Sequence, residues 1–424
     1  MARTRRTKYL LIGGGVAAAS AAASIRDLDG SGRIVLVTEE PRLPYDRPPL
    51  SKGIITGELR ARQIASNRRR FYLQKRIHVL RRRSVTRLAL EGPNPEATLS
   101  DGSRVVFERA LVATGGRPRR LPLPGAQLPG VHTLRTIADA ATISADAGSG
   151  RHAVIAGGGF IGLELAASLT RIGTGVTLVE QRNRVWPPAT PVALSDYLRS
   201  YLESLGVTVH TGAALDAVAG EERVRAVRTG DREIECDFVC MAAGIEPNSS
   251  LAESAGLAVD DGILVDDRLR TSDPRIFAAG DVCRFRDPFS GALRRVEHHG
   301  NAEYGGLLAG ANMAGADRTF DFLPNLWSDI GSLTVEVAGD EERYDSLIER
   351  GSFGDGWIAV GMKAGLPICY FALGAARADL SALQLLIRSR PKLAEMQEER
   401  GTRLREQLGD IHRPLPQIAH ELLQ

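Results

Sequence analysis

The sequence contains little cysteine. Only four cysteines occur in 424 residues, at positions 236, 240, 283 and 369. No two of them form a CxxC pair, and they do not combine with histidine at the spacings of zinc sites. We therefore expect reduced thiols, no metal site and no dithiol redox centre, as is usual in a cytoplasmic protein.

Long apolar runs are also missing. No window offers the ~20 apolar residues that a membrane-spanning helix needs. The opening MARTRRTK and the following YLLIGGGVAAASAAAS imitate a signal peptide, but the glycines at 13–15 break the apolar stretch and the next residues complete a folded unit. We expect no signal, no membrane contact and, at a net charge of only +3, no nucleic-acid partner.

Lysine is scarce, because only five of the 54 basic residues are lysines. The arginines gather between Arg60 and Arg87, where no acidic residue interrupts the basic positions 60, 62, 68, 69, 70, 75, 76, 81, 82, 83 and 87. A local field of this kind steers acidic partners towards the protein and is screened by salt. The alternative is a solvated arginine-rich face.

The chain opens on a strand–turn–helix–strand unit, KYLLIGGGVAAASAAASIRDLDGSGRIVLVTEE. Gly13, Gly15 and Ala18 give the GxGxxG/A spacing, which provides a tight turn, close backbone approach to a pyrophosphate and close helix packing. The helix then offers its unpaired N–H groups and the positive end of its dipole to phosphates. Glu39 follows the second strand, where an acid accepts hydrogen bonds from ribose. The unit predicts a dinucleotide site.

The same unit returns at HAVIAGGGFIGLELAASLTRIGTGVTLVEQRNRV. Gly157, Gly159 and Gly162 occupy the three positions, and Glu180 ends the second strand. One GxGxxG is weak evidence, but two complete copies predict two dinucleotide sites. Glu180 can bind a free 2′-OH and repels a 2′-phosphate, so NADH is favoured over NADPH. Arg182 lies two residues further on and leaves NADPH as the alternative nucleotide.

Shorter segments connect these units. Thr114 and Gly115 end an apolar strand in ALVATGGRPRRLP, Gly244 repeats that shape in FVCMAAGIEPNSS, and a strand in TSDPRIFAAGDV ends at Gly280 with Asp281 beyond it. The first two suit a chain that leaves one domain and returns to it. We predict an α/β protein with two Rossmann-like dinucleotide-binding domains and a C-terminal α+β domain. The predicted bounds are 1–115 with 247–325 for the first domain, 116–246 for the second and 326–424 for the third.

The paired glycine motifs, the ATG segment and the AAGD segment together resemble the two-dinucleotide flavoprotein superfamily that includes glutathione reductase. The disulfide reductases of that superfamily carry a cysteine pair where this chain has LPYDRPPLSKG, residues 43–53. This segment instead resembles the PxxRPPLSK segment of apoptosis-inducing factor and of the ferredoxin reductases of multicomponent oxygenases, including the putidaredoxin-reductase type. RRVEHHGNAEYGGLLAGANMAG and NLWSDIG are similar to apoptosis-inducing factor and its bacterial relatives. The resemblance extends from about Lys8 to about Leu386.

The resemblance implies FAD on the first domain and NADH on the second. It places Arg47 near the FAD phosphates and ribityl region. It also places Lys52 beside flavin N5, paired with Glu164, which keeps the lysine oriented and charged. The alternative for this pair is a surface lysine and a helix-capping glutamate.

Further site residues follow from the same resemblance. Asp281 is the acid that binds the ribityl chain. Glu297, His298 and His299 begin a helix whose N-terminal amides are expected to face the pyrimidine edge of the flavin, although ordinary helix-start residues are the alternative for the histidines. Trp327 resembles a tryptophan that lies against the isoalloxazine, while a core position suits a large aromatic equally well.

The function implied is an NADH-dependent flavoprotein reductase that passes hydride to flavin N5 and electrons to an external acceptor. The first candidate acceptor is an acidic [2Fe–2S] ferredoxin of an oxygenase or P450 system, docked on the basic region Arg68–Arg83. Two alternatives are a flavoenzyme with its own small-molecule substrate, and a slow redox sensor resembling apoptosis-inducing factor. The tail is helical with an interruption at Pro391 and forms either a partner surface or a solvated helix. A monomer or a homodimer is expected.

Overall fold

The computed structural model describes residues 4–186, 189–400 and 404–423, with side chains at 396–400 left aside. The chain forms two compact units. Unit 1 comprises Met1–Pro48, Ala61–Arg117 and Ile245–Phe322, and unit 2 comprises Pro49–Arg60, Pro118–Gly244 and Leu323–Gln424. The α/β class is confirmed, whereas the three predicted domain boundaries stay a prediction because this division follows compactness alone.

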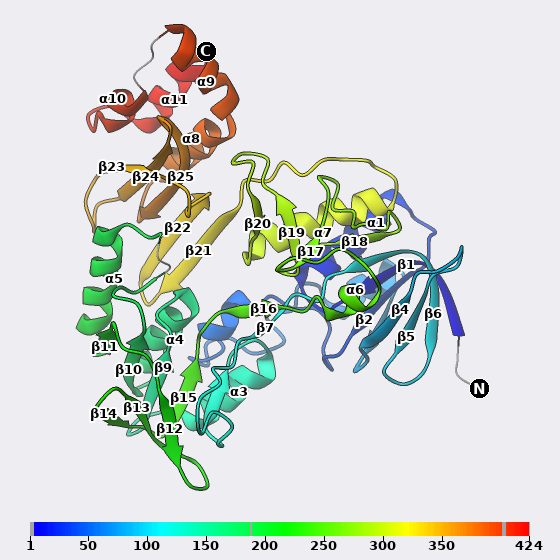
Figure 1. Ribbon diagram of the computed structural model, residues 1–424, viewed down its shortest axis with the longest axis horizontal. Coiled ribbons are helices and arrows are strands. Elements are labelled where there is room, and N and C mark those ends of the chain that lie inside the picture. The colour runs from blue at the N-terminus through cyan, green and yellow to red at the C-terminus, as the bar shows by residue number, and fades with distance from the viewer. Residues whose placement is uncertain (1–3, 187–188, 401–403, 424) are drawn as a thin grey trace. The chain divides into compact units, whose positions relative to one another are not determined.

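Unit 1 is built on a mainly parallel sheet with the strand order β3-β2-β1-β6-β5-β4, in which β18 also pairs with β6 (Figure 1). Its central strands are continuous apolar runs because a parallel sheet is covered on both faces. β4 and β5 are antiparallel to their neighbours. The strands are β1 (Thr4–Ile12), β2 (Ile34–Thr38), β3 (Ile77–Arg81), β4 (Val85–Ala89), β5 (Glu96–Leu99), β6 (Arg104–Val112) and β18 (Ile276–Ala278).

Smaller elements complete unit 1. Two short sheets are β17-β19-β20 and β16-β7, the latter formed by the segments that join the units. The strands are β7 (Gly116–Pro118), β16 (Ile245–Pro247), β17 (Ile263–Leu264), β19 (Cys283–Arg286) and β20 (Leu293–Arg295). The helices are α1 (Val16–Leu28), α2 (Arg69–Gln74), α6 (Ser250–Ser254) and α7 (His299–Met313).

Helices α1 and α7 pack against each other through small residues. A Cβ added to Gly306 of α7 would lie 2.2 Å from the carbonyl oxygen of Ala17 in α1, and one added to Gly310 would lie 2.5 Å from that of Ala21. Only glycine allows so close an approach of two helix backbones. The contact fixes the position of α7, whose N-terminus begins at the predicted flavin residues.

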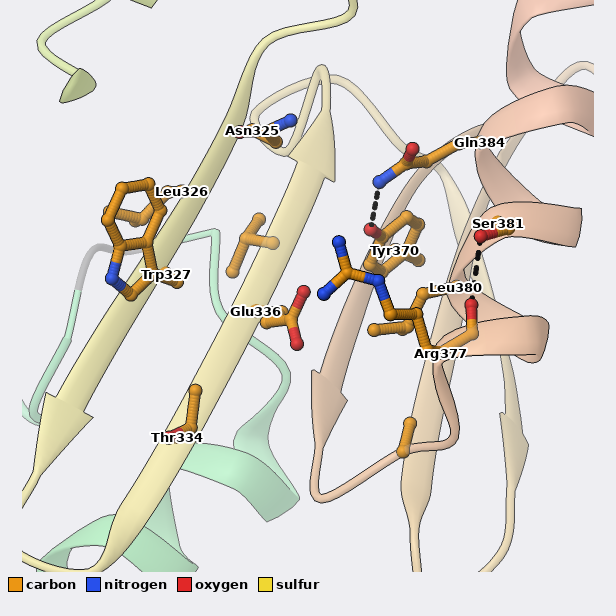
Figure 2. A pocket seen from close by; sticks show the side chains of 12 residues that line it. Asn325, Leu326, Trp327, Thr334, Glu336, Tyr370, Arg377, Leu380, Ser381 and Gln384 are labelled. Carbon is orange, nitrogen blue, oxygen red and sulfur yellow. Dashed lines mark hydrogen bonds between the residues drawn. The ribbon is translucent and has the colours of Figure 1, made fainter. Parts of the chain in front are cut away.

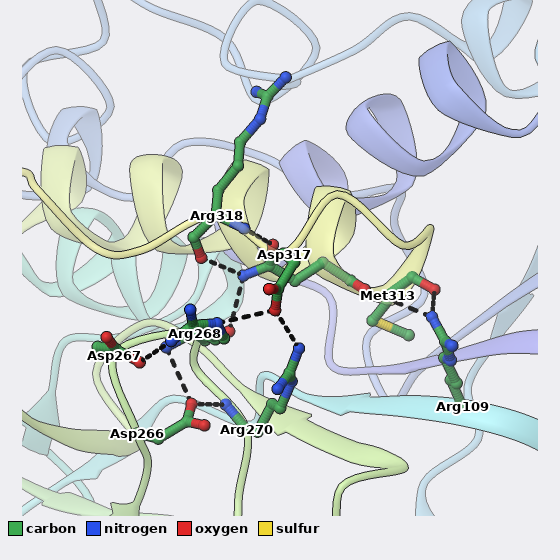
Figure 3. Close-up of polar contacts among 9 residues, drawn as sticks. Arg109, Asp266, Asp267, Arg268, Arg270, Met313, Asp317 and Arg318 are labelled. Carbon is green, nitrogen blue, oxygen red and sulfur yellow. Dashed lines mark hydrogen bonds and ion pairs between the residues drawn. The ribbon is translucent and has the colours of Figure 1, made fainter.

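The C-terminal end of α7 is held by a polar cluster (Figure 3). The buried Asn312 amide donates to the carbonyl oxygens of Arg268 (2.9 Å) and Arg318 (2.8 Å) and accepts from the Arg318 N–H (2.7 Å). Asp317 forms ion pairs with Arg268 and Arg270 at 2.8 and 2.6 Å. The middle and the C-terminal end of α7 are thus positioned by specific contacts.

Unit 2 contains a second parallel sheet, with the order β11-β10-β9-β15-β8, and an antiparallel sheet β12-β13-β14. The strands are β8 (Val131–Thr133), β9 (His152–Ala156), β10 (Gly175–Glu180), β11 (Thr208–Thr211), β12 (Ala217–Gly220), β13 (Val224–Thr229), β14 (Arg232–Glu235) and β15 (Phe238–Met241). The helices are α3 (Ile137–Asp146), α4 (Phe160–Arg171) and α5 (Val192–Ser204). Strand β9, turn, α4 and β10 form the predicted second glycine unit.

The rest of unit 2 is an antiparallel sheet with the order β21-β22-β25-β24-β23, followed by helices. The strands are β21 (Asn325–Ile330), β22 (Leu333–Gly339), β23 (Ser346–Arg350), β24 (Trp357–Lys363) and β25 (Leu366–Leu373). The helices are α8 (Arg377–Arg388), α9 (Arg390–Arg400), α10 (Leu404–Gly409) and α11 (Leu415–Leu423), which gather at one end of this sheet in Figure 1. The predicted interruption at Pro391 separates α8 from α9.

The tail is packed rather than merely solvated. α11 buries Leu415, Ile418 and Leu422 and packs against α8. The buried Arg350 donates hydrogen bonds to the carbonyl oxygens of Leu408, Asp410 and Arg413 at 2.7, 2.8 and 2.5 Å. Arg350 therefore ties the tail to β23, as does Arg405 of α10, which donates to the Ser346 hydroxyl at 2.9 Å.

All four cysteines are free and buried. Burial raises the pKa of the Cys240 and Cys283 thiols to about 12, so neither is a thiolate at neutral pH. Within the described ranges, helices that combine the length and the apolarity needed to cross a bilayer do not occur. The same residues contain no cluster of three or more potential metal ligands of the His, Cys, Asp or Glu type.

Candidate functional site

The first glycine turn has the geometry that its motif predicts. Gly13 adopts φ +133°, and a Cβ there would lie 2.1 Å from the carbonyl oxygen of Ala113. Gly15 is the N-cap of α1, and Ala18 is fully buried inside the helix–sheet contact. The turn therefore leaves the backbone N–H groups at the start of α1 open to a ligand.

Arg47 reaches across this turn. Its Nη1 lies 3.0 Å from the place that a Cβ on Gly15 would take, so a larger residue there would press on the guanidinium. Glu40 holds the arginine through a 3.3 Å ion pair and also accepts a 2.7 Å hydrogen bond from Tyr45. A guanidinium above a helix N-terminus forms an anion site, which fits the diphosphate of a dinucleotide.

The two glycine units differ at the acid that follows the second strand. In unit 1 the backbone N–H of Gly13 donates to the carbonyl oxygen of Val37. In unit 2 the backbone N–H of Gly157 donates in the same way to the carbonyl oxygen of Val179. Thr38 therefore takes the position that Glu180 has in unit 2, and Glu39 lies one residue further on, exposed to solvent. The ribose role of Glu39 stays a prediction.

The end of β18 lies close to the N-terminal turns of α1 and α7. A Cβ on Gly280 would lie 3.3 Å from Ala17 of α1 and 3.5 Å from Ala302 of α7. Asp281, directly after Gly280, is half-buried in this region. The fold therefore brings together three segments of unit 1 that are far apart in the sequence.

His298 is the N-cap of α7 and His299 its first residue. This is the helix-start position of the alternative interpretation, and a contact with flavin or nicotinamide stays a prediction. Glu297, just before them, forms a 2.5 Å ion pair with Arg295. Its carboxylate is therefore already held within unit 1.

The connecting segments cross beside β7 and β16. Thr114 donates from its hydroxyl to the Asn248 carbonyl (2.8 Å), and Asn248 donates from its amide to the Thr114 carbonyl (3.0 Å). Gly115 and Gly244 have φ of +61° and +84°, which glycine adopts without strain. These residues shape the chain crossings, and their contact with a cofactor stays a prediction.

The second glycine turn is equally tight. A Cβ on Gly157 would lie 2.4 Å from the carbonyl oxygen of Ala242, and one on Gly162 would lie 2.0 Å from that of Gly157. Gly159 is the N-cap of α4 and has no heavy atom within 4 Å of its Cβ position among those described. Glu180 is buried and accepts backbone hydrogen bonds from Gly158 (2.6 Å) and Arg182 (2.8 Å).

A tryptophan missed by the sequence reasoning lies next to this turn. The backbone N–H of Trp186 donates to the carbonyl oxygen of Gly158 at 2.6 Å, and the centroid of the Trp186 ring lies 6.0 Å from that of the Phe160 ring. Trp186 is buried with φ +70°, which is costly for a bulky residue and persists only where the surroundings enforce it. The residue fixes the loop that follows Glu180.

Lys52 and Glu164 form the predicted pair within unit 2. The Lys52 Nζ lies 3.3 Å from Glu164 Oε1, and the lysine side chain is only 19% exposed. Glu164 is buried in the second turn of α4. The alternative of a surface lysine and a helix-capping glutamate is therefore wrong.

The pair belongs to a larger cluster. Ser51 donates a short hydrogen bond to Glu164 Oε2, and Ser328 of β21 donates to Oε1 at 2.7 Å. A second carboxylate, Asp329, accepts from Lys52 at 3.1 Å. Desolvation by burial raises the pKa of Glu164 above its ordinary value, although Lys52 and the two hydroxyls oppose that rise.

Trp327 lies on the opposite face of β21 from Ser328, and 40% of it is exposed. The alternative of a core residue is therefore wrong, and its contact with the isoalloxazine stays a prediction. It borders a pocket of about 560 Å³ between the sheet and α8 (Figure 2). The pocket also has Thr334, Glu336 and Arg377 in its wall.

The pocket is polar. Burial raises the pKa of Glu336, while Arg377 lowers it and Asp329 raises it further. Burial also raises the pKa of Tyr370 to about 12, and its hydroxyl accepts a 3.0 Å hydrogen bond from Gln384. Carboxyl, guanidinium and hydroxyl groups thus line one pocket.

The basic region Arg68–Arg83 lies on α2 and on β3, at the edge of the main sheet of unit 1. Arg68, Arg69 and Arg70 are exposed, and Leu73 among them is 65% exposed. Some of the charge is neutralised, because Lys75 pairs with Asp27 at 2.8 Å and Arg83 pairs with Asp101. The region still presents several arginines around one apolar side chain.

Several functional candidates were not found from the sequence. They are Glu40, Ser51, Ser328, Asp329 and Trp186. The serines and Asp329 lie beside Lys52 or Trp327 in the quoted segments, so their positions were available, but their partners are far away in the sequence. A chemical role could be assigned only once those partners were known.

Comparison with known proteins gives consistent results. The family described as "Pyridine nucleotide-disulphide oxidoreductase" matches residues 7–306. A "Probable ferredoxin reductase CtmF" from Castellaniella defragrans is 36% identical over 385 residues, covering 90% of this chain and 94% of that protein. The ferredoxin–NAD(+) reductase component of the biphenyl dioxygenase system of Paraburkholderia xenovorans is 32% identical over 403 residues, covering 94% and 97%. The reductase in the solved covalent putidaredoxin reductase–putidaredoxin complex matches with a TM-score of 0.90 and 28% identity, covering 98% of this chain and 99% of that chain.

Proposed function

The chain belongs to the pyridine nucleotide-disulphide oxidoreductase family, and we propose that it is an NADH-dependent flavoprotein reductase that delivers electrons to a [2Fe–2S] ferredoxin. The observation that carries the proposal is the Lys52–Glu164 pair, 3.3 Å apart, in a chain whose four cysteines are buried and form no disulfide. A lysine–glutamate pair in place of a redox-active cysteine pair suits direct transfer of electrons to an external protein. Relatives named as ferredoxin reductases support the choice of acceptor.

Residues of unit 1 hold FAD in this proposal. The N–H groups at the start of α1 and the Arg47 guanidinium bind the diphosphate, and Asp281 accepts hydrogen bonds from the ribityl chain. When bound, FAD takes a hydride from NADH and gives up the two electrons one at a time. Glu297, His298 and His299 lie at the start of α7, where the helix dipole favours negative charge.

The second glycine turn binds NADH. The N–H groups at the start of α4 receive the diphosphate, and Glu180 accepts hydrogen bonds from the ribose hydroxyls. Glu180 is already fixed by two backbone N–H groups, so it is oriented before the ligand arrives. Its negative charge disfavours the 2′-phosphate of NADPH.

Lys52 would lie beside flavin N5 when FAD is bound, where its ammonium group would favour the arrival of electron density on the flavin. Its ammonium group is anchored by Glu164, which the hydroxyls of Ser51 and Ser328 hold in place. Trp327 covers the ring from β21. A cytoplasmic location belongs to the same proposal, because four free thiols suit a reducing compartment.

The ferredoxin docks on the basic region Arg68–Arg83. Three exposed arginines next to the exposed Leu73 form an apolar centre with a charged rim, the usual composition of a docking surface. Acidic ferredoxins would approach faster at low salt. A merely solvated arginine-rich face is the other outcome of the test below.

The first test is anaerobic titration of the purified protein with NADH and with NADPH, with the flavin absorbance as the readout. We expect bleaching by about one equivalent of NADH and weak reduction by NADPH. Addition of an oxidised [2Fe–2S] ferredoxin should restore the flavin absorbance. A protein that binds no FAD, or whose reduced flavin persists with ferredoxin, contradicts the proposed function.

The docking surface is tested by charge reversal. Arg69→Glu with Arg70→Glu should lower kcat/KM for ferredoxin by tenfold or more and flatten its salt dependence, while reduction of ferricyanide by NADH is unchanged. Arg225→Glu, an exposed arginine in unit 2, is the matched control. Equal effects of the two changes would assign the basic region to a solvated face.

A further inference from the structure

The Lys52 ammonium lies between two carboxylates in different surroundings. Glu164 Oε1 is 3.3 Å from Nζ and its side chain is 7% exposed, whereas Asp329 Oδ2 is 3.1 Å away and its side chain is 40% exposed. Glu164 is shielded from solvent, whereas Asp329 is partly exposed to it. A structural anchor needs only the first.

Glu164 is held in a fixed orientation. The ammonium and two serine hydroxyls direct three donors at its two oxygens. A carboxylate with this many donors is fixed in orientation. Its contacts suit an anchor for Lys52.

Asp329 has a different set of neighbours. Its Oδ1 accepts a 2.8 Å hydrogen bond from Thr334, which lies in the wall of the pocket beside Trp327. Its Oδ2 faces Lys52. The charged groups on the elements next to it are Lys52, Glu164, Glu336 of β22 and Arg377 of α8. Asp329 thus links Lys52 to Thr334 in the wall of that pocket.

The overall reaction releases one proton. NADH gives up a hydride, two electrons pass to two [2Fe–2S] ferredoxins, and the hydrogen that arrived on N5 must leave as a proton. The N–H bond at N5 breaks, its electrons go to the ferredoxins, and the proton needs a path to water. Two of the three N–H groups of Lys52 point to Glu164 and Asp329, so a third can face the ring.

We propose that Asp329 is the proton outlet of this site, acting through Lys52. Lys52 passes a proton from one of its N–H groups to Asp329 Oδ2 as it takes up the proton released at N5, and Asp329 passes it to the water of the adjacent pocket. The number of protons on Lys52 is unchanged at the end. The inference rests on the proposed function, because it needs Lys52 beside the flavin.

Asp329 is a positioning and relay residue in this scheme, so its removal should act on only one half of the reaction. Reduction by NADH releases no proton from N5, so Asp329→Asn should slow this step, measured by stopped flow, much less than it slows reoxidation. Reoxidation by ferredoxin should slow by tenfold or more, since positioned proton acceptors typically contribute about 10²–10⁴-fold. Asp329→Glu should recover most of the rate.

Two further measurements separate a relay from a structural effect. In Asp329→Ala, formate or imidazole buffers should restore reoxidation in proportion to their concentration. Thr334→Val is the matched control, because it removes the hydroxyl at Oδ1 and keeps the carboxylate. It should change reoxidation less than twofold and show no dependence on buffer.

A readout without turnover uses the protein stripped of nucleotide. In the infrared spectrum of the side-chain carboxylates at constant pH, the Asp329 stretching band, assigned by its loss in Asp329→Asn, should shift when Lys52→Met removes the ammonium that donates to Oδ2. Unchanged reoxidation in both Asp329→Asn and Asp329→Ala overturns the inference. A wild-type protein that fails to reduce ferredoxin refutes the proposed function instead.

Discussion

Removal of Lys52 should destabilise the protein at high pH far more than at low pH. Lys52→Met leaves Glu164 buried with two serine hydroxyls and no cation. Asp329 loses its partner too, but it is 40% exposed and can be solvated. The stability change therefore reports on Glu164.

The size of the loss follows from the geometry. At 3.3 Å, two unit charges attract by about 5 kcal/mol at an effective dielectric constant of about 20, before desolvation is counted. Breaking a buried ion pair from one side typically costs about 3–5 kcal/mol. Lys52 is 19% exposed and the hydroxyls remain, so we expect the lower end, about 3 kcal/mol, while Glu164 stays charged.

Protonation of Glu164 limits this loss. Burial raises the pKa of Glu164 in the native protein, and the loss of Lys52 raises it further. A carboxyl group with a raised folded-state pKa stabilises the fold when protonated, below its unfolded pKa, and that contribution is lost as pH rises through the folded pKa. Between pH 8 and pH 5.5, protonation becomes easier by about 3.4 kcal/mol. The loss should therefore be about 3 kcal/mol at pH 8 and under about 1 kcal/mol at pH 5.5.

Hydrogen exchange of the α4 amides, corrected for the intrinsic pH dependence of exchange, measures this locally, because a chain of two units need not unfold in one step. Glu164→Gln is the second arm of a double-mutant cycle, and Lys52→Met/Glu164→Gln should regain most of the protection. The reasoning is refuted when Lys52→Met loses the same protection at both pH values. It is also refuted when the double variant is no better protected than Lys52→Met.

Three other outcomes are expected. Gly306→Ala should lower the thermal unfolding midpoint by several degrees, because its Cβ would lie 2.2 Å from the Ala17 carbonyl oxygen. The control Gly305→Ala should be tolerated, because the nearest atom to its Cβ lies at 3.6 Å. Equal midpoints of the two variants would contradict the close α1–α7 contact. Arg350→Met should expose the tail to limited proteolysis at least tenfold faster without changing NADH-dependent ferricyanide reduction, since three carbonyl groups lose their donor; an unchanged cleavage rate would show that helix packing and Arg405 hold the tail without Arg350. Arg47→Gln should weaken FAD binding, measured by fluorescence, by tenfold or more, and unchanged affinity would remove Arg47 from the diphosphate site.

The glycine turns could be predicted from the sequence because their physics is local. The left-handed φ of Gly13 and Gly157 is a property of each turn itself, and Gly162 must be small because a Cβ there would lie 2.0 Å from the Gly157 carbonyl oxygen of the same turn. The strand–turn–helix pattern therefore carries the information by itself. The predicted α/β class was confirmed for the same reason.

The acid after the second strand shows what local reasoning leaves open. Glu39 and Glu180 look equivalent in the sequence, yet the strand register gives the position of Glu180 to Thr38 in unit 1. A shift of one residue along a strand reverses the direction of the side chain. Hydrogen bonding between β1 and β2 fixes that register, and the sequence pattern does not report it.

The sequence alone determined the two dinucleotide motifs, the missing dithiol and the Lys52 segment, because each depends on residue type and short spacing. The tertiary structure decided that Lys52 contacts both Glu164 and Asp329, and that the hydroxyls of Ser51 and Ser328 hold Glu164. Those partners come from segments more than one hundred residues away. Only the folded chain sets the distances between their charges, and burial, which raises the pKa of Glu164, exists only once the surrounding elements have packed.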